Sequence, residues 1–207
     1  MNLKVKICGL TAVEEAGYVN QSGADYAGMV LFYDKSRRNL TLEKALEIKK
    51  ALDPRVKAVA VTVSPDRAQA ELIARAGFDY LQIHGALKEG VTEVGIPILK
   101  AFHVEELEHF KEYHTCSAIA GYVFDAQRPG SGKTFDWRLV CNLPRDGKMF
   151  FLAGGLHPDN VAMAIECVHP DGVDVSSGVE YPEGGKNPAL VTAFVRNAKL
   201  DYLHRMG

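Results

Sequence analysis

Eight short apolar runs, most of them followed by a longer helical pattern, constrain the fold of this chain more than any other feature of its sequence. Several runs are almost continuously apolar, which is typical of parallel strands that are covered on both faces. We expect strands at Lys4–Ile7, Tyr26–Phe32, Lys57–Val63, Tyr80–His84, Ile98–Phe102, Gly121–Asp125, Phe150–Ala153 and Gly172–Val175.

Helical patterns separate these runs, as crossover connections between parallel strands require. Thr41 and the cluster Ser64, Pro65 and Asp66 stand where helix N-terminal signals are expected. The segment 86–97 is too short for a full helix and predicts one turn or an irregular connection. We expect helices at Leu42–Leu52, Asp66–Ala76, Val104–Tyr113, Asn160–Val168 and Pro188–Leu203.

Eight β/α units in 207 residues predict one α/β domain over residues 1–207, closed as a (β/α)8 barrel of the TIM-barrel type. A doubly wound open sheet is the less favoured arrangement, because closure leaves no edge strand to protect. Barrel enzymes build their active sites at the C-terminal ends of the strands. The residues directly after each apolar run are therefore the candidates for chemistry.

Charge and cysteine content narrow the classes of function. A formal net charge of −2 argues against a nucleic-acid partner, so an anionic ligand must be held by local groups. The four cysteines are scattered without a CxxC pair, which argues against a disulfide framework or a metal site. No apolar run has the length of a membrane span or a secretory segment. We expect a cytoplasmic protein with free thiols, no membrane partner and no metal.

Two strand ends carry groups suited to proton transfer. A lone cysteine such as Cys8 is often a small buried hydrophobe, but Lys6 lies on the same face of the strand and a cation favours the thiolate. Asp125 ends the sixth run after largely apolar residues. It is either a turn former or a general acid that retains its proton because its pKa is raised.

The loop after the sixth run contains Gly130, Gly132 and Lys133. Its glycines permit a mobile lid, although each glycine alone is weak evidence. Asp136, which follows this loop, is expected to cap the next helix rather than to take part in catalysis.

The seventh and eighth runs lead into two loops rich in glycine and serine, AGGL and VDVSSGVE. Glycine lets backbone N–H groups approach phosphate oxygens and serine hydroxyls add donors, so a phosphate can bind without a large basic patch. Tight turns would explain either loop alone, but they explain the pair less well. The residues predicted to bind substrate here are Gly154, Gly155, Asp174, Ser176, Ser177 and Gly178.

Two further strand ends present polar side chains. The loop after the second run carries Lys35, Arg37 and Arg38, whose guanidinium groups either bind a substrate carboxylate or form a solvated basic loop. Gln82 and His84 share one face of the fourth strand, where His84 is either a polar residue at the mouth or a core histidine satisfied by hydrogen bonds. The remaining histidines show no ligand spacing and are assigned no role, including His103, His109 and His157.

Taken in order, KICGL, FYDKSRR, LQIHG, FDA with GSGKTFDW, LAGGL with PDNV, and VDVSSGVE resemble the phosphoribosylanthranilate isomerase family over almost the whole chain. The resemblance implies conversion of N-(5-phosphoribosyl)anthranilate to 1-(2-carboxyphenylamino)-1-deoxyribulose 5-phosphate. This cofactor-free Amadori rearrangement belongs to tryptophan biosynthesis. By the same resemblance, Asp125 is the general acid and Cys8 the general base, and Arg38 rather than Arg37 holds the anthranilate carboxylate.

The chain departs from the family pattern at Asp34 and Asn39, and in the segment EYPEGGKNP after SSGV. These departures concern packing of the aromatic ring and the entry to the last helix. Two alternatives are a related phosphosugar isomerase or epimerase barrel, and an idle barrel that only binds a phosphometabolite. The joint presence of Cys8 and Asp125 argues against both. The sequence is compatible with a monomer or a homodimer.

Overall fold

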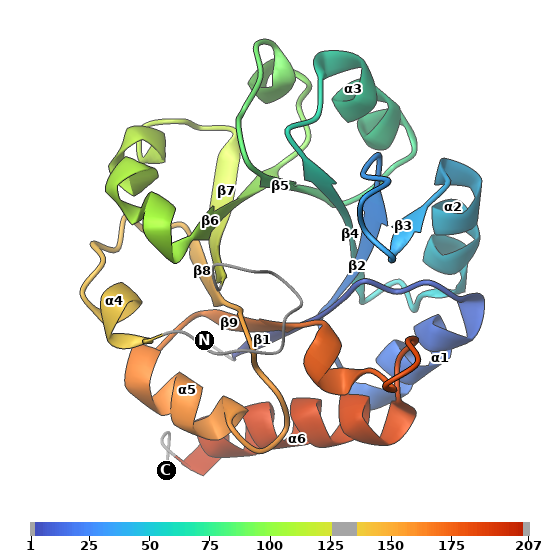
Figure 1. Cartoon of the computed structure of the whole chain (residues 1–207), viewed down its shortest axis with the longest axis vertical. Helices are drawn as coiled ribbons and strands as arrows, with labels where there is room; N and C mark the ends of the chain where they lie inside the picture. The colour runs from blue at the N-terminus through green and yellow to red at the C-terminus, as the bar shows by residue number, and fades with distance from the viewer. Residues whose placement is uncertain (1–2, 126–135, 205–207) are drawn as a thin grey trace.

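The computed structural model describes residues 3–125 and 136–204, which form a closed parallel barrel surrounded by helices (Figure 1). β1 pairs with β2 on one side and with β9 on the other, and this double pairing closes the ring. The expected (β/α)8 barrel is thereby confirmed. The barrel strands are β1 (Lys4–Cys8), β2 (Tyr26–Leu31), β4 (Lys57–Val63), β5 (Tyr80–His84), β6 (Ile98–His103), β7 (Ile119–Asp125), β8 (Met149–Leu152) and β9 (Gly172–Val175).

One additional strand, β3 (Asn39–Leu40), pairs with β2 next to the mouth of the barrel. β2 ends one residue earlier than expected because Phe32 has a left-handed backbone with φ of 57°. β6 extends one residue further than expected, to His103. All eight barrel strands were therefore predicted, with ends that differ by at most two residues, whereas β3 was not predicted.

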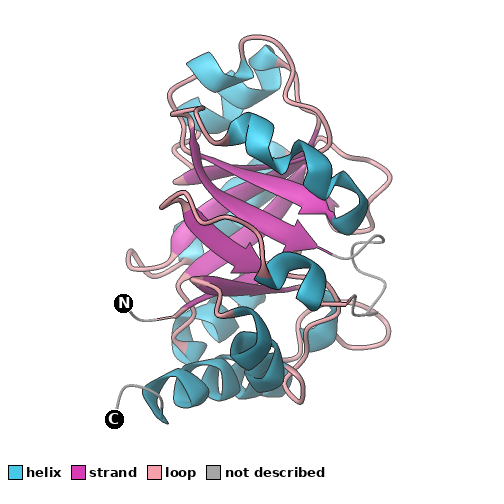
Figure 2. Cartoon of the chain, turned by 90° about the vertical axis from the view of Figure 1, so that its left-hand side faces the viewer, coloured by secondary structure: helices cyan, strands magenta, loops and turns pink. Residues whose placement is uncertain are grey.

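The helices lie outside the strands, which all run in one direction (Figure 2). The segment 104–113 is a 3₁₀ helix, and the segment 86–97 contains a single turn, as expected. The helix at Val13–Ser22 was not predicted, because Gly17 interrupts a weak apolar stripe. The helices are α1 (Val13–Ser22), α2 (Leu42–Ala51), α3 (Arg67–Arg75), η1 (Val91–Glu93), η2 (Val104–Tyr113), α4 (Arg138–Cys141), α5 (Val161–Val168), η3 (Ser177–Val179) and α6 (Pro188–His204).

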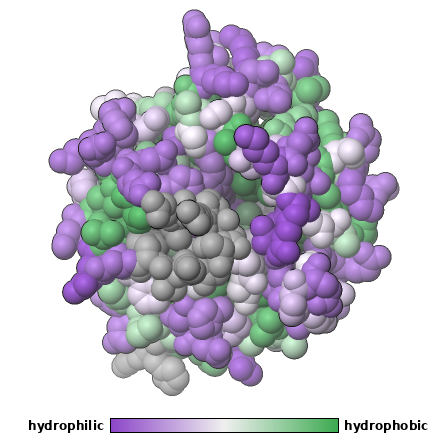
Figure 3. Space-filling view, in the orientation of Figure 1, coloured by the Kyte–Doolittle hydropathy of each residue, from purple (hydrophilic) through white to green (hydrophobic). Residues whose placement is uncertain are grey.

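Strand pleating divides the core into two layers. Alternate residues such as Val5, Ile7 and Phe124 face outward and pack against the helices. The others face the barrel interior, where Tyr26, Val59, Leu99 and Phe151 form an apolar plug, among others. Hydrophilic residues predominate on the face of the molecule seen in Figure 3. Among the described residues, the plug fills the barrel below the mouth, so the barrel interior opens toward the C-terminal ends of the strands.

In the described part of the chain, no helix combines the length and apolar character needed to cross a membrane.

Candidate active site

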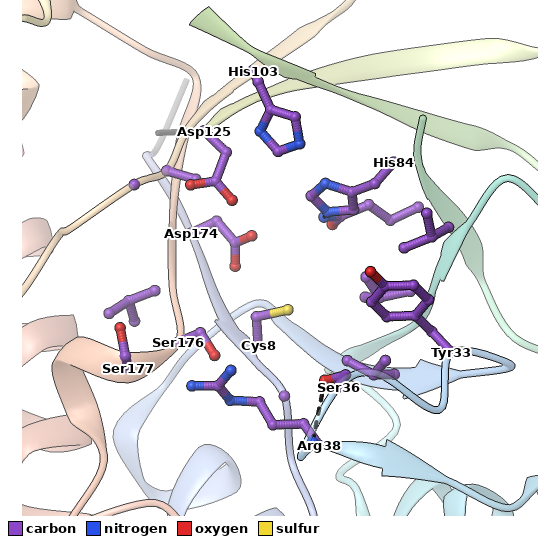
Figure 4. Close-up of a pocket in the computed structure, with 18 of the residues that line it drawn as sticks. Cys8, Tyr33, Ser36, Arg38, His84, His103, Asp125, Asp174, Ser176 and Ser177 are labelled. Carbon is purple, nitrogen blue, oxygen red and sulfur yellow. Dashed lines mark hydrogen bonds between the residues drawn. The ribbon is translucent and has the colours of Figure 1, made fainter. Parts of the chain in front are cut away.

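A pocket of about 780 Å³ opens at the C-terminal mouth of the barrel (Figure 4). Every predicted site residue lines it except Gly178. The structure therefore brings together the ends of strands that are far apart in the sequence, as the barrel prediction requires. The predicted residues that line the pocket are Cys8, Arg38, Gln82, His84, Asp125, Gly154, Gly155, Asp174, Ser176 and Ser177.

Cys8 lies at the end of β1 with its thiol directed into the pocket (Figure 4). Lys6, two residues earlier and fully buried, donates to both carboxylate oxygens of Asp174 at 2.9 Å. Gly28 of β2 stands opposite Cys8 in the parallel register. A Cβ atom at Gly28 would lie 2.8 Å from the sulfur and 3.1 Å from the Lys6 ammonium. Glycine is thus required where thiol and ammonium meet.

Burial governs the ionisation of this cluster. Desolvation disfavours the charged form of Lys6, but the charges of Asp174 and Cys8 outweigh it, so the pKa of Lys6 lies above its ordinary value. Burial likewise raises the pKa of Cys8, and the neighbouring Lys6 lowers it only in part. Lys6 therefore holds its proton more tightly than a free lysine, and Cys8 holds its proton more tightly than a free cysteine although Lys6 favours the thiolate.

Asp125 ends β7, and its partly buried carboxyl group also points into the pocket (Figure 4). The loop whose glycines permit a mobile lid, with Gly130, Gly132 and Lys133, lies outside the described residues. Asp136 lies just before α4 and its carboxylate accepts the backbone N–H of Arg138 at 3.1 Å. This contact is the one expected of a residue at a helix start.

The loops after β8 and β9 meet at one side of the pocket. Gly154 and Gly155 have φ values of 84° and 65°, a backbone conformation that favours glycine. A Cβ atom at Gly178 would lie 1.9 Å from the carbonyl oxygen of Leu156, so the two loops are in direct contact there. Ser176 and Ser177 line the adjoining surface. The predicted phosphate loops thus form one surface.

The Arg38 side chain crosses the mouth of the barrel above Gly9. A residue with a side chain at position 9 would collide with Arg38, because its Cβ atom would lie 2.4 Å from the arginine Cδ. The Arg38 Nε and Nη2 atoms donate to the two oxygens of Glu180, each at 2.7 Å. Arg37 also donates to Glu180, but its side chain is 56% exposed against 15% for Arg38. Arg38 is therefore the better enclosed of the two arginines in the pocket lining.

Gln82 and His84 form the facing side of the pocket, with Gln82 Nε2 and His84 Nε2 2.9 Å apart. Burial, together with the charges of His103, Lys6 and Lys100, lowers the pKa of His84 to about 3, so its ring is neutral. Gln82 is buried, and its Oε1 atom has no hydrogen-bond partner among the described residues. Gln82 thus contributes a neutral amide to the pocket lining.

Several pocket residues were missed by the strand-end rule. His103 lines the pocket although it was assigned no role, because β6 is one residue longer than expected. Tyr33, Ser36 and Glu106 also line it. Tyr33 and Ser36 come from the loop after β2, whose course no periodic pattern predicts, and Glu106 lies in η2. Glu180 lies within the motif VDVSSGVE, but its contact with Arg38 joins residues 142 positions apart.

A thiol and a carboxyl group that face one pocket at the mouth of a parallel barrel define a barrel enzyme equipped for proton transfer. The family model for N-(5'phosphoribosyl)anthranilate (PRA) isomerase matches residues 5–197. The chain belongs to this isomerase family.

Relatives of the same name are similar over nearly their full length. The N-(5'-phosphoribosyl)anthranilate isomerases of Geotalea uraniireducens and Aquifex aeolicus are each 42% identical to this chain and cover 95% of it and 98% of the relative. The crystal structure of the Thermotoga maritima enzyme matches with a TM-score of 0.84 and 35% identity, over 95% of this chain and 98% of that one. A structure in complex with reduced 1-(o-carboxyphenylamino)-1-deoxyribulose 5-phosphate matches with a TM-score of 0.82, 33% identity and the same coverage.

Proposed function

We propose that this chain converts N-(5'-phosphoribosyl)anthranilate to 1-(2-carboxyphenylamino)-1-deoxyribulose 5-phosphate, with Asp125 as the general acid and Cys8 as the general base. The observation that carries these roles is the placement of both groups at strand ends that face the same pocket. The bound ligand of the related complex is a reduced form of the product that this reaction would give.

The first step opens the ribose ring. Protonated Asp125 donates its proton to the ring oxygen as the bond between this oxygen and C1 breaks. The anthranilate nitrogen lone pair forms the C1=N bond of a Schiff base at the same time. Because a carboxyl group must hold its proton to act in this way, the apolar end of β7 is a suitable position for it.

The second step moves a proton from C2. The Cys8 thiolate accepts this proton, the C–H electrons form a C1=C2 bond, and the C1=N electrons return to nitrogen. The resulting enolamine loses its hydroxyl proton and gains one at C1 to give the ketone. No proton is gained or lost overall. The ammonium of Lys6, which interacts with the sulfur, offsets the charge of the thiolate.

Three other groups of residues bind the substrate in this proposal. The loops with Gly154, Gly155 and Ser176–Gly178 hold the phosphate through N–H and hydroxyl donors. Arg38 holds the anthranilate carboxylate. Neutral His84 and Gln82 face the sugar hydroxyls, which carry no charge. Asp174 lines the pocket, and its part is to hold Lys6 beside the thiol.

The reaction needs neither a metal nor an organic cofactor in this scheme, and it needs Cys8 as a free thiol. A reducing cytoplasm is the compartment that keeps it so. The Thermotoga maritima relative is described as dimeric, and this chain acts as a monomer or a homodimer.

The experiment is to follow the fluorescence of freshly prepared N-(5'-phosphoribosyl)anthranilate after the protein is added in buffer with a chelator. We expect a rapid, saturable loss beyond spontaneous hydrolysis, with the ribulose product identified by chromatography. Absence of turnover by folded protein with intact substrate would refute the proposal and redirect attention to another phosphosugar.

A further inference from the structure

Glu180 is the meeting point of three cations behind the pocket. Its carboxylate accepts from Lys186 at 2.7 Å, from Arg38 at 2.7 Å on each oxygen, and from Arg37 at 2.5 Å. The Glu180 and Lys186 side chains are only 4% and 1% exposed, whereas surface ion pairs stay in contact with water. One carboxylate thus organises three basic side chains beside a pocket.

The position of Glu180 is set by a hairpin at residues 180–186, which follows β9. Glu180 and Lys186 form an antiparallel bridge, and the backbone N–H of Asn187 donates to Val179. The backbone N–H of Lys186 donates to the buried carboxylate of Glu15, at 2.6 Å, and this carboxylate also accepts from the loop after β1. Contacts with Glu15 therefore hold the hairpin in place independently of its contact with Arg38.

The geometry of the Arg38 contact leaves its ligand-binding edge open. A guanidinium has five N–H donors, and Glu180 takes two of them, from Nε and Nη2. Gly9 keeps the space under the side chain clear, and Ser36 accepts the backbone N–H of Arg38 at 3.1 Å. An arginine held in this way loses little freedom when a second carboxylate binds to its remaining donors.

Ionisation of Glu180 supports the same role. Burial alone would raise its pKa, but the hydrogen bond from Arg38 and the charge of Lys186 lower this pKa to about 2. The carboxylate is charged throughout the pH range of an ordinary assay. Its hold on Arg38 is therefore constant and does not act as a pH switch.

We propose that Glu180 is a positioning residue that fixes the Arg38 guanidinium, and thereby sets the preference of this enzyme for substrates whose aromatic ring carries a carboxylate. The proposal rests on the proposed function, because it takes anthranilate as the aromatic group. It adds a residue that touches no substrate and acts through Arg38.

The test compares two ligands that differ in one group: reduced 1-(o-carboxyphenylamino)-1-deoxyribulose 5-phosphate, and the same compound with hydrogen in place of the carboxylate. We expect the wild-type protein to bind the carboxylated ligand more than about tenfold tighter, the effect of charge-assisted hydrogen bonds. In Glu180→Gln we expect the ratio of the two affinities to fall about tenfold, while the affinity for inorganic phosphate stays within about twofold of the wild-type value. Glu183→Gln, an exposed glutamate in the same hairpin, is the matched control.

Two more variants separate positioning from structure. Lysine has no forked guanidinium for Glu180 to orient. In an Arg38→Lys background, Glu180→Gln should therefore change the preference for the carboxylated ligand little. Glu180→Asp keeps the charge beside Lys186 but moves it, and we expect an intermediate preference with a native melting temperature. This variant tests the same contact if glutamine at position 180 prevents folding.

The outcomes distinguish the two proposals. An unchanged or stronger preference in Glu180→Gln, in a wild-type enzyme that turns over its substrate, overturns the role of Glu180 alone. Parallel loss of affinity for both ligands and for inorganic phosphate shows a purely structural role and overturns it as well. A wild-type protein without any preference for the carboxylated ligand overturns the proposed function together with this inference.

Discussion

The two sides of the pocket handle charge differently. The charged side comprises Lys6 with Asp174 and Arg38 with Glu180, where each cation is held by a carboxylate of the chain itself. The polar side comprises buried Gln82 and half-buried His84, which carry no charge. Fixed ion pairs suit the anionic ends of a substrate, and neutral acceptors suit its hydroxyl groups. A chain with a net charge of −2 can thus bind an anion, because its positive charge is concentrated and oriented on one side.

Removal of the general acid or the general base should have the largest effect on turnover. We expect Cys8→Ala and Asp125→Asn each to lower kcat by about 10³-fold or more, since general acid–base groups contribute about 10² to 10⁴-fold. Binding of a phosphate-containing product analogue should persist, as measured by calorimetry. Near-normal turnover in either variant would remove the assigned role.

Loss of Lys6 tests the charged side directly. Lys6→Met removes the cation that lowers the pKa of Cys8, so the limb on which kcat rises with pH should move to higher pH. The direction follows from the chemistry, because a base acts only when deprotonated and a higher pKa delays deprotonation. An unmoved limb would show that Lys6 does not act on the thiol.

The same substitution leaves the Asp174 carboxylate buried without its partner, and we expect a loss of about 3 kcal/mol in unfolding free energy. Lys6→Met with Asp174→Asn should recover part of this loss in a denaturant titration. Lys4→Met, at the exposed end of the same strand, is the matched control.

The polar side should respond much less. Because the pKa of His84 is about 3, its ring is neutral above pH 5 and should add no inflection to the pH profile near 6.5. We expect His84→Asn to lower kcat/KM less than about tenfold, since one neutral hydrogen bond is at stake. A profile that loses an inflection near neutrality in this variant would show that His84 titrates during turnover.

The smallest effect is expected at the phosphate loops. Ser177→Ala removes one neutral donor and should raise KM about two- to tenfold with kcat nearly unchanged. Initial-rate kinetics distinguish this outcome from a fall in kcat at constant KM, which would place Ser177 at the reacting atoms instead.

Strand pleating explains how much of the site could be predicted. Lys6 with Cys8, Gln82 with His84, and Asp174 with Ser176 are pairs two residues apart, so each pair faces the barrel axis together. A period of two is visible in a sequence without any structure. The barrel strands themselves were predicted from short, almost continuously apolar runs, and their ends differ from the prediction by at most two residues.

The residues that were missed depend on contacts between distant loops. Glu180 meets Arg38 across 142 positions, and Gly28 is required only because Cys8 and Lys6 face it from the neighbouring strand. No regular spacing in the sequence predicts contacts of this kind. The segment 104–113 was predicted as helical, but its tighter 3₁₀ form depends on how it packs over β6 and β7.

The contact of Gly178 with Leu156 has a consequence for how this barrel can be recombined. Because one loop leaves no room for a methyl group on the other, the turns after β8 and β9 cannot be varied independently. A chimera that takes only one of them from a relative would have to accommodate a foreign backbone at this point. We therefore expect the turns after β8 and β9 to be transferred together, as one unit, in a working chimera.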